Sequence, residues 1–216
     1  MSFLQIISEL SQSFLITIYI FTVTVVFSLP LGLLISFGRM SSNSIVRNLV
    51  GAYISVMRGT PLMLQLIVVY FGPYYLLGLK MGTGYRMTAI FIAFTINYAA
   101  YFAEIYRSGI QSIDKGQYEA AELLGYTKTN SFFRIILPQV VKRILPSITN
   151  EVITLVKDTA FAFTLSVMEM FTMAKAIAAR ETSLIPLFIA GILYYIFNYA
   201  VAFAFNYLEK KLDYYK

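Results

Sequence analysis

The chain has 216 residues and a net charge of +6; 58% of its residues are hydrophobic, only 13% are charged, and the mean hydropathy is +0.70. Soluble domains carry about 25% charged residues, so half that proportion predicts a protein embedded in lipid. The sequence contains no Cys, no His and no GxxxxGKS/T loop, which excludes disulfides, thiolate metal sites, Ser–His catalysis and nucleotide hydrolysis of the P-loop type.

Five segments are apolar over about 20 residues, the length that a helix needs to cross a bilayer. In chain order they cover residues 14–37, 49–77, 85–106, 145–168 and 184–207. No Lys or Arg precedes the first segment, which distinguishes it from a cleaved signal peptide and predicts a retained helix. The sequence therefore predicts an all-α integral membrane protein with five transmembrane helices, organised as a single domain over residues 1–216.

The second segment is interrupted by the sequence Arg58-Gly59-Thr60-Pro61. Proline lacks a backbone N–H and disfavours helical geometry in the residue before it. Because two separate pieces would each be too short to cross a bilayer, we expect one broken helix. Backbone groups freed by such a break are tolerated in a membrane only where they line protein or a cavity, so Thr60 and Pro61 are predicted to lie near a transport pathway.

The basic residues between the segments predict the orientation of the chain. If the C-terminus is inside the cell, eleven Lys and Arg residues lie in cytoplasmic regions and only Lys80, Arg86, Lys175 and Arg180 lie outside. This positive-inside bias places the N-terminus outside and the long connection over residues 108–142 in the cytoplasm. Because the basic residues cluster at the ends of apolar segments, the net positive charge favours membrane topology over nucleic-acid binding.

The connection over residues 108–142 is too long for a bare linker, so we expect it to contain helices of its own. Ala and Leu favour a helix over residues 119–124, and Gly125 is suited to end that helix in the left-handed conformation. Residues 127–130 could cap a second helix that runs through Phe132 and Ile136.

The same connection contains the order Glu119-Ala120-Ala121, three residues, Gly125, nine residues, Ile135, one residue and Leu137-Pro138. This order resembles, position for position, the EAA motif in the cytoplasmic coupling loop of ABC importer permeases. In that family a short helix of the loop docks into a cleft of a separate P-loop ATPase, which binds ATP and Mg²⁺. The resemblance implies that Glu119, Ala120, Ala121 and Gly125 couple this chain to such an ATPase.

Ionisable side chains within a membrane segment are costly, about 2.5–3.5 kcal/mol at a helix centre, and usually face a cavity or a partner. In the fourth segment Glu151 and Asp158 lie two helical turns apart, about 10.5 Å along one face of the helix. Two carboxylates on one face would suit a cationic or zwitterionic solute and would repel an anion. In the third segment Asn97, Tyr101 and Glu104 form a second polar stripe.

These charges also have an alternative interpretation, in which they form buried ion pairs that never contact a substrate. Arg107 follows Glu104 by three residues and is therefore an obvious local partner. Arg58 could neutralise an acid in the same way, and Lys157 could pair or extend toward the membrane surface. The ion-pair interpretation is favoured for Glu104, and a position at the pathway is favoured for Asp158. For Glu151 neither interpretation is favoured over the other.

Three further stretches resemble permeases that import polar amino acids. Residues 58–62 match their RGTPL segment, residues 101–109 their YxAExxRxG stretch and residues 155–159 their LVKDT stretch. The resemblance implies a five-helix core per subunit, two paired permease subunits, two ATPases and an extracytoplasmic substrate-binding protein. In members that handle basic amino acids, acidic residues of the fourth span contribute to the substrate site, and alignment of the motifs places them at Glu151 and Asp158.

Together these observations predict the transmembrane subunit of an ATP-driven importer in the cell membrane, which moves polar and preferably cationic amino acids by alternating access. We expect no catalytic residue, metal site or cofactor in this chain. Two alternatives remain open. An ion-coupled carrier or cation channel would use the acidic stripe without an ATPase, and a membrane scaffold would keep its charges paired and transport nothing.

Overall fold

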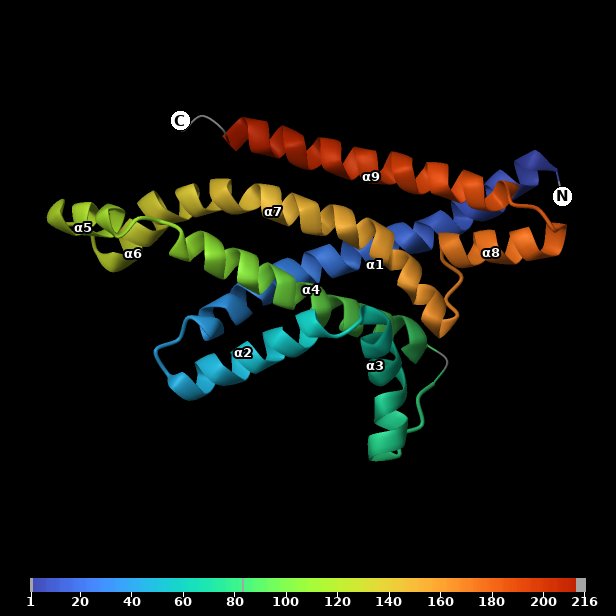
Figure 1. Cartoon of the computed structure of the whole chain (residues 1–216), viewed down its shortest axis with the longest axis horizontal. Helices are drawn as coiled ribbons and strands as arrows, with labels where there is room; N and C mark the ends of the chain where they lie inside the picture. The colour runs from blue at the N-terminus through green and yellow to red at the C-terminus, as the bar shows by residue number, and fades with distance from the viewer. Residues whose placement is uncertain (1, 83, 213–216) are drawn as a thin grey trace.

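The computed structural model describes residues 2–82 and 84–212, and every regular element within these ranges is helical. The elements are α1 (Phe3–Arg39), α2 (Ser44–Gly59), α3 (Leu62–Leu77), α4 (Tyr85–Gln111), α5 (Lys115–Leu123), α6 (Lys128–Ser131), η1 (Phe132–Ile136), α7 (Leu137–Asp158), η2 (Thr159–Leu165), α8 (Met170–Glu181) and α9 (Ile185–Leu212). The long helices α1, α4, α7 and α9 run through the body of the molecule, and α3 projects to one side (Figure 1). The start of α1 and α8 lie at one end, and α5 and α6 lie at the other.

Within the described residues, α1, α4 and α9 are each long and apolar enough to cross a membrane on their own. Two bent pairs reach the same length and composition only when each pair is taken as one span: α2 with α3, bent by 112°, and the stretch from α6 to η2 with α8, bent by 60°. The five predicted segments therefore correspond to three continuous helices and two bent ones. α1 extends beyond both predicted ends, and α4 and α9 extend beyond their predicted C-terminal ends, where polar residues interrupt the apolar pattern.

The predicted break in the second segment is confirmed. α2 ends at Gly59, Thr60 and Pro61 have extended backbones with ψ of 147° and 133°, and α3 begins at Leu62. Since proline supplies no N–H and opposes helical geometry in Thr60, the chain changes direction at this point.

Side chains satisfy the backbone groups that this break leaves open. The Gln65 amide nitrogen donates to the Met57 carbonyl oxygen at 3.0 Å and to the Thr60 hydroxyl oxygen at 2.8 Å. The Asn97 amide nitrogen, on α4, donates to the same Met57 carbonyl at 3.1 Å and to the Gln65 side-chain oxygen at 2.9 Å. The break is therefore fixed against α4 by two buried amides, in keeping with the cost of unpaired polar groups in lipid.

The fourth predicted segment, residues 145–168, is not a single α-helix. α7 ends at Asp158, η2 continues the chain in 3-10 geometry, and Ser166 then adopts the left-handed conformation at φ 55°. The chain turns there into α8, which begins after Glu169. No Gly or Pro lies in residues 159–169, so this turn has none of the sequence signals that mark the break at Pro61.

α1 packs along α4 through small residues. The buried face of α1 includes Ser28, Gly32 and Ser36, one helical turn apart. At Gly32 the two helices approach so closely that a Cβ atom there would lie 2.8 Å from the Phe102 Cβ atom and 3.0 Å from the Ala99 carbonyl oxygen. Small residues permit such close contact between membrane helices, whose association depends on packing and not on the exclusion of water.

Glu169 is a fully buried carboxylate at the start of α8. Its oxygens accept hydrogen bonds from the backbone N–H groups of Phe171 (2.8 Å) and Thr172 (2.7 Å), from the Thr172 hydroxyl (2.8 Å) and from the Tyr194 hydroxyl on α9 (3.0 Å). Glu169 therefore caps α8 and joins it to α9. An acidic residue directly before a helix is a typical N-terminal signal, but nothing in the sequence indicates that this one is buried.

Glu169→Ala is expected to lower the stability of the protein by about 2–4 kcal/mol, because it removes the cap of α8 and an acceptor of the Tyr194 hydroxyl. Glu169→Gln keeps one side-chain oxygen as an acceptor and is expected to lose less. The measurement is the temperature at which half of the detergent-solubilised protein leaves the monodisperse peak in size-exclusion chromatography. An alanine variant as stable as the wild type would contradict the capping role.

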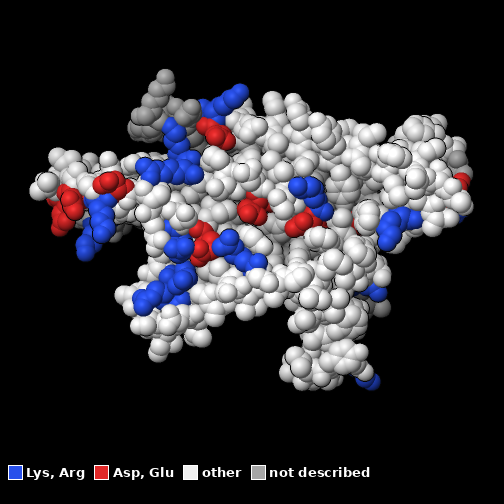
Figure 2. Space-filling view, viewed as in Figure 1, with Lys and Arg blue, Asp and Glu red and all other residues white. Residues whose placement is uncertain are grey.

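One side of α9 exposes large apolar side chains at three- and four-residue spacing: Phe188, Ile192, Tyr195, Tyr199 and Phe203. Such a face is typical of a helix in contact with lipid or another membrane subunit. On the face shown in Figure 2, charged side chains run from the α5–α6 end into the middle of the molecule, whereas most of the surface along α3 and α9 is uncharged. Charge is thus concentrated where the predicted functional residues lie.

Candidate functional site

The connection over residues 108–142 contains helices of its own, as predicted. α5 is followed by α6, then by the π-helical η1, which continues directly into α7. Thr127 caps α6 by accepting a hydrogen bond from the Asn130 N–H at 3.3 Å, and the helix then runs through Phe132 and Ile136. The second predicted helix is therefore confirmed, with an extra residue per turn in η1 that the sequence pattern did not indicate.

Gly125 ends the first of these helices in the left-handed conformation, with φ of 78°. The Gly125 N–H donates to the Glu122 carbonyl oxygen at 2.9 Å, and the Tyr126 N–H donates to the Ala121 carbonyl oxygen at 3.0 Å. These two bonds define a Schellman motif, in which glycine is the preferred residue because it has no Cβ atom. The predicted conformation of Gly125 is confirmed.

The residues exposed on α5 are not the same set as the four motif residues. Glu119 and Ala120 are exposed, but Ala121 is only 1% exposed and lies against the inside of the connection. Leu123 and Leu124 are 90% and 75% exposed. The surface open to a partner therefore combines a carboxylate and a small residue with two leucines outside the motif. Adjacent leucines between a polar helix and its terminal glycine are the sequence signal that could have identified them.

The last part of the motif forms the joint between the connection and α7. Ile135 lies in η1, Leu137 begins α7, and Pro138 follows directly after this π-helical stretch. α6, η1 and α7 follow one another without an intervening loop. The connection is therefore attached by continuous helix to the element that carries Glu151.

A pocket of about 460 Å³ opens between α2, α4 and α7. Its polar lining residues are Arg58, Tyr101, Glu104, Arg107, Ser108, Ser112, Arg143, Ser147 and Glu151. Three of the predicted site residues, Tyr101, Glu104 and Glu151, are thus brought together from two helices. Ser147 was not predicted, although it lies one turn before Glu151 on the same face of α7, a spacing that could have identified it.

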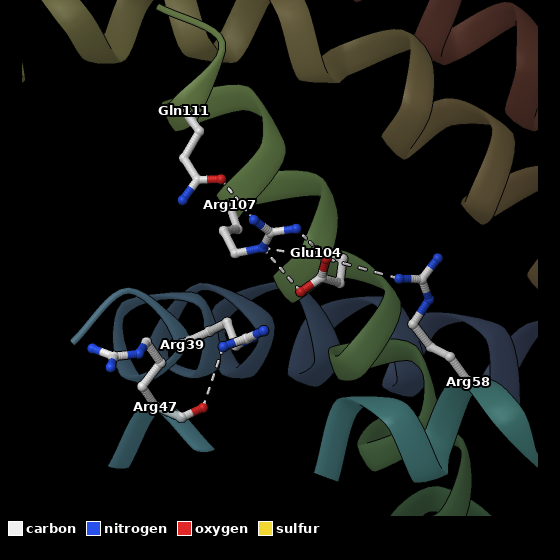
Figure 3. A network of polar contacts seen from close by, with 6 residues as sticks. All are labelled: Arg39, Arg47, Arg58, Glu104, Arg107 and Gln111. Carbon is white, nitrogen blue, oxygen red and sulfur yellow. Dashed lines mark hydrogen bonds and ion pairs between the residues drawn. The ribbon is translucent and has the colours of Figure 1, made fainter. Parts of the chain in front are cut away.

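Glu104 is bound by Arg107, as expected from their spacing. The Arg107 Nη2 and Nε atoms donate to Glu104 oxygens at 2.7 Å and 3.1 Å, and Nη1 donates to the Gln111 side-chain oxygen at 2.6 Å. Arg58 Nη1 lies farther away, 3.9 Å from Glu104 Oε2, and its guanidinium carbon lies 5.3 Å from the centre of the Tyr101 ring. Figure 3 shows the two arginines on either side of Glu104. Glu104 therefore belongs to an ion-pair network in the pocket wall.

The two acids of α7 have different surroundings. Asp158 lies beyond the lining of the pocket, and the buried Tyr98 side chain of α4 donates a hydrogen bond to its Oδ2 atom at 2.7 Å. Glu151 lines the pocket and forms no hydrogen bond or ion pair with any residue in the described ranges 2–82 and 84–212. Of the two carboxylates, Glu151 is therefore the one that is open to a ligand in this structure.

The remaining predicted residues lie outside the pocket lining. Asn97 and Thr60 belong to the Gln65 network that closes the helix break, and Pro61 is exposed at the start of α3. Asn97 binds the carbonyl oxygen of Met57, one residue before Arg58, and Thr60 lies two residues after Arg58. These residues therefore affect the pocket indirectly, by fixing the end of α2 that carries Arg58. Gln65 belongs to the same network and was not predicted.

Comparison with known proteins identifies the family. Residues 28–214 match the family described as binding-protein-dependent transport system inner membrane component. ArtQ, the arginine transport system permease protein of Bacillus subtilis (strain 168), is 39% identical over 198 residues, which cover 91% of this chain and 89% of ArtQ. GlnP of Rickettsia bellii (strain RML369-C), assigned to glutamine transport, is 37% identical over 199 residues, which cover 92% of this chain and 90% of GlnP.

A solved structure with the same fold supports this assignment. It is the crystal structure of an amino acid ABC transporter with histidines, which matches this chain with a TM-score of 0.86 at 30% identity, covering 98% of this chain and 99% of that one. The predicted resemblance to ABC importer permeases is thereby confirmed. The chain belongs to the family of binding-protein-dependent transport system inner membrane components, the multi-pass, non-enzymatic subunits of ABC importers that work with a separate ATPase and a substrate-binding protein.

Proposed function

We propose that this chain forms the path by which polar amino acids, preferably cationic ones, enter the cytoplasm by alternating access. The observation that carries the proposal is the pocket between α2, α4 and α7, in which Glu151 has no partner among the described residues. In this proposal the N-terminus is outside the cell and the connection over residues 108–142 is in the cytoplasm. A second permease subunit, of the same or a sister sequence, completes the path, and an extracytoplasmic binding protein delivers the substrate.

The charges of the pocket favour a substrate that carries both signs. Glu104 is already paired with Arg107, so its charge is largely compensated within the protein. Glu151 has no hydrogen-bond or ion-pair partner among the described residues, and such a carboxylate is costly within a membrane protein unless a cation or water stabilises it. A ligand cation beside Glu151 would supply that charge. Asp158 lies farther along the same helix and is proposed to act on a cation that moves beyond Glu151.

The amino acid class is supported by the relatives. ArtQ is named for arginine transport and GlnP for glutamine transport. These two amino acids share the α-amino and α-carboxylate groups and differ in the charge of the side chain. A path for either would need groups of both signs, and the pocket has them in Arg58 and Glu151.

The surface of α5 is proposed to be the docking site for the ATPase. It presents Glu119, Ala120, Leu123 and Leu124 together at one end of the molecule. Exposed apolar side chains beside charged ones are typical of protein–protein contact surfaces. Because the helical path from α6 through η1 to α7 is continuous, a displacement of the connection would move Glu151 with it.

Glu151→Gln is expected to lower arginine uptake about tenfold or more and glutamine uptake by much less, since a charge-assisted hydrogen bond contributes about 1.5–3 kcal/mol. The measurement is initial uptake of arginine, lysine and glutamine into proteoliposomes that contain the complete importer with its ATPase and binding protein. Asp158→Asn keeps an acceptor for Tyr98 and is expected to shift the ratio in the same direction by a smaller factor.

The matched control is Glu209→Gln, which removes a carboxylate near the end of α9, far from the pocket in sequence and outside its lining. It is expected to leave the arginine-to-glutamine ratio of uptake unchanged. Equal losses for all three amino acids in Glu151→Gln would remove the case for a cation site. Transport that persists without the ATPase would contradict the proposed mode of driving the import.

A further inference from the structure

Arg58 stands at the end of α2, beside the break and on the wall of the pocket that also contains Glu151. We propose that Arg58 determines specificity by receiving the α-carboxylate of the transported amino acid. This inference rests on the proposed function of the pocket and adds to it the group that recognises the other end of the substrate.

The other two arginines of the pocket are already engaged. Arg107 is held by Glu104 and Gln111, and Arg143 donates to the carbonyl and hydroxyl oxygens of Ser112. Arg58 makes no hydrogen bond to any residue that the structure describes. Its donors are therefore available to a ligand, whereas Arg107 uses all three of its guanidinium nitrogens within the protein and Arg143 uses Nη1.

Neighbouring side chains position the Arg58 guanidinium but leave its N–H groups without hydrogen-bond acceptors among the described residues. The nearest carboxylate oxygen, Glu104 Oε2, is 3.9 Å away and is already bound by Arg107 at 2.7 Å. The Tyr101 ring supports the guanidinium at 5.3 Å, within the range of a cation–π contact. The side chain remains 45% exposed. In Figure 3 it extends from α2 toward Glu104, across the space between α2 and α4.

The backbone that carries Arg58 is fixed, which suits a recognition residue. Met57, the preceding residue, has its carbonyl oxygen bound by both Gln65 and Asn97. Thr60, two residues later, is bound by Gln65. A guanidinium on such a fixed stem presents two parallel N–H groups, the geometry that matches a carboxylate. A cationic amino acid could then place its carboxylate at Arg58 and a cationic group at Glu151.

The test compares arginine with agmatine, which is arginine without the α-carboxylate. The dissociation constant of each ligand is measured at equilibrium for the purified permease–ATPase complex in nanodiscs, with the wild-type permease and with Arg58→Gln. The wild type is expected to bind arginine about tenfold or more tightly than agmatine. In Arg58→Gln the affinity for arginine is expected to fall until the ratio approaches one, while the affinity for agmatine stays within about twofold of the wild type.

Two further variants separate recognition from structure. Arg47→Gln removes an arginine near the start of the same helix, outside the pocket, and is expected to keep the wild-type ratio. Arg58→Lys retains the charge without the bidentate fork and is expected to give an intermediate ratio of arginine to agmatine affinity. If Arg58→Gln does not assemble, the ratio for Arg58→Lys is the result that tests the proposal. A purely structural role for Arg58 would weaken both ligands equally.

The outcomes distinguish this inference from the proposed function. A wild-type ratio that persists in Arg58→Gln and in Arg58→Lys would overturn the role of Arg58 and leave the pocket as an amino acid site. A wild-type complex that binds neither arginine nor glutamine would overturn the proposed function, and the role of Arg58 with it. Collapse of the ratio only in the Arg58 variants would establish the carboxylate contact.

Discussion

Gly32→Val is expected to prevent the chain from accumulating as a folded membrane protein. Even the Cβ atom of the new side chain would lie 2.8 Å from the Phe102 Cβ atom and 3.0 Å from the Ala99 carbonyl oxygen. Ala99 presents backbone that cannot rotate away, so α1 would have to separate from α4 along the face that also contains Ser28 and Ser36. Overpacking of this kind costs about 3 kcal/mol or more at a rigid site, a large part of the stability of a domain.

The measurement is the yield of monodisperse protein after detergent extraction, with its thermal midpoint in size-exclusion chromatography. Gly191→Val is the matched control, because Gly191 also lies in a long apolar helix but a Cβ atom there would meet no atom within 4 Å. It should give the yield of the wild type. Equal yields of the two variants would show that α1 and α4 can separate without loss of the fold.

Gly125→Val is expected to uncouple ATP hydrolysis from uptake while the subunit still folds. A Cβ atom at Gly125 would meet no atom within 4 Å, so the whole effect comes from the backbone, which has a φ of 78°. A side chain in the left-handed conformation costs about 1–2 kcal/mol, and a branched one is the least tolerated. The end of α5 would relax to another conformation and change the orientation of Leu123, Leu124 and the docking surface.

The expected result is a fall of about tenfold in uptake by proteoliposomes, with ATP hydrolysis continuing and with a normal yield of purified subunit. Gly125→Asn is the control, because asparagine adopts the left-handed conformation more readily than other non-glycine residues. It is expected to keep most of the uptake. Loss of uptake in both variants would point to the need for a bare backbone at the contact and not to the conformation of the turn.

Local signals in the sequence were sufficient for much of the fold. Proline marks the break after Thr60, and glycine marks the end of α5, because each restricts or extends the backbone conformations of its own position. Within the residues that the structure describes, apolar length located three helices that could each cross a membrane alone and two bent pairs that reach that length only when taken together, and the fixed spacing of the EAA motif led to the correct family. The single-domain extent, the orientation and the roles of the site residues remain predictions.

Features that depend on contacts between distant residues were not predictable in the same way. The turn at Ser166 contains neither Gly nor Pro. Three residues later, Glu169 is buried and accepts a hydrogen bond from Tyr194, a contact between residues 25 positions apart. The bond between Tyr98 and Asp158 joins residues 60 positions apart. Spacing along one helix correctly paired Glu104 with Arg107, but it could not show that Asp158 is bound and Glu151 open.

The close contact at Gly32 limits how this molecule can move. Sliding α1 by one turn would place Ser28 or Ser36 where Gly32 now meets Phe102, and neither residue can lose its Cβ atom to fit there. α1 and α4 must therefore keep one register and rotate as a rigid frame. Hinge motion is left to the bend at Ser166, because Gln65 and Asn97 hold the bend at Thr60–Pro61 against α4. The bend at Ser166 follows α7, which carries Glu151, so probes of domain motion should be attached on α7 and on α8.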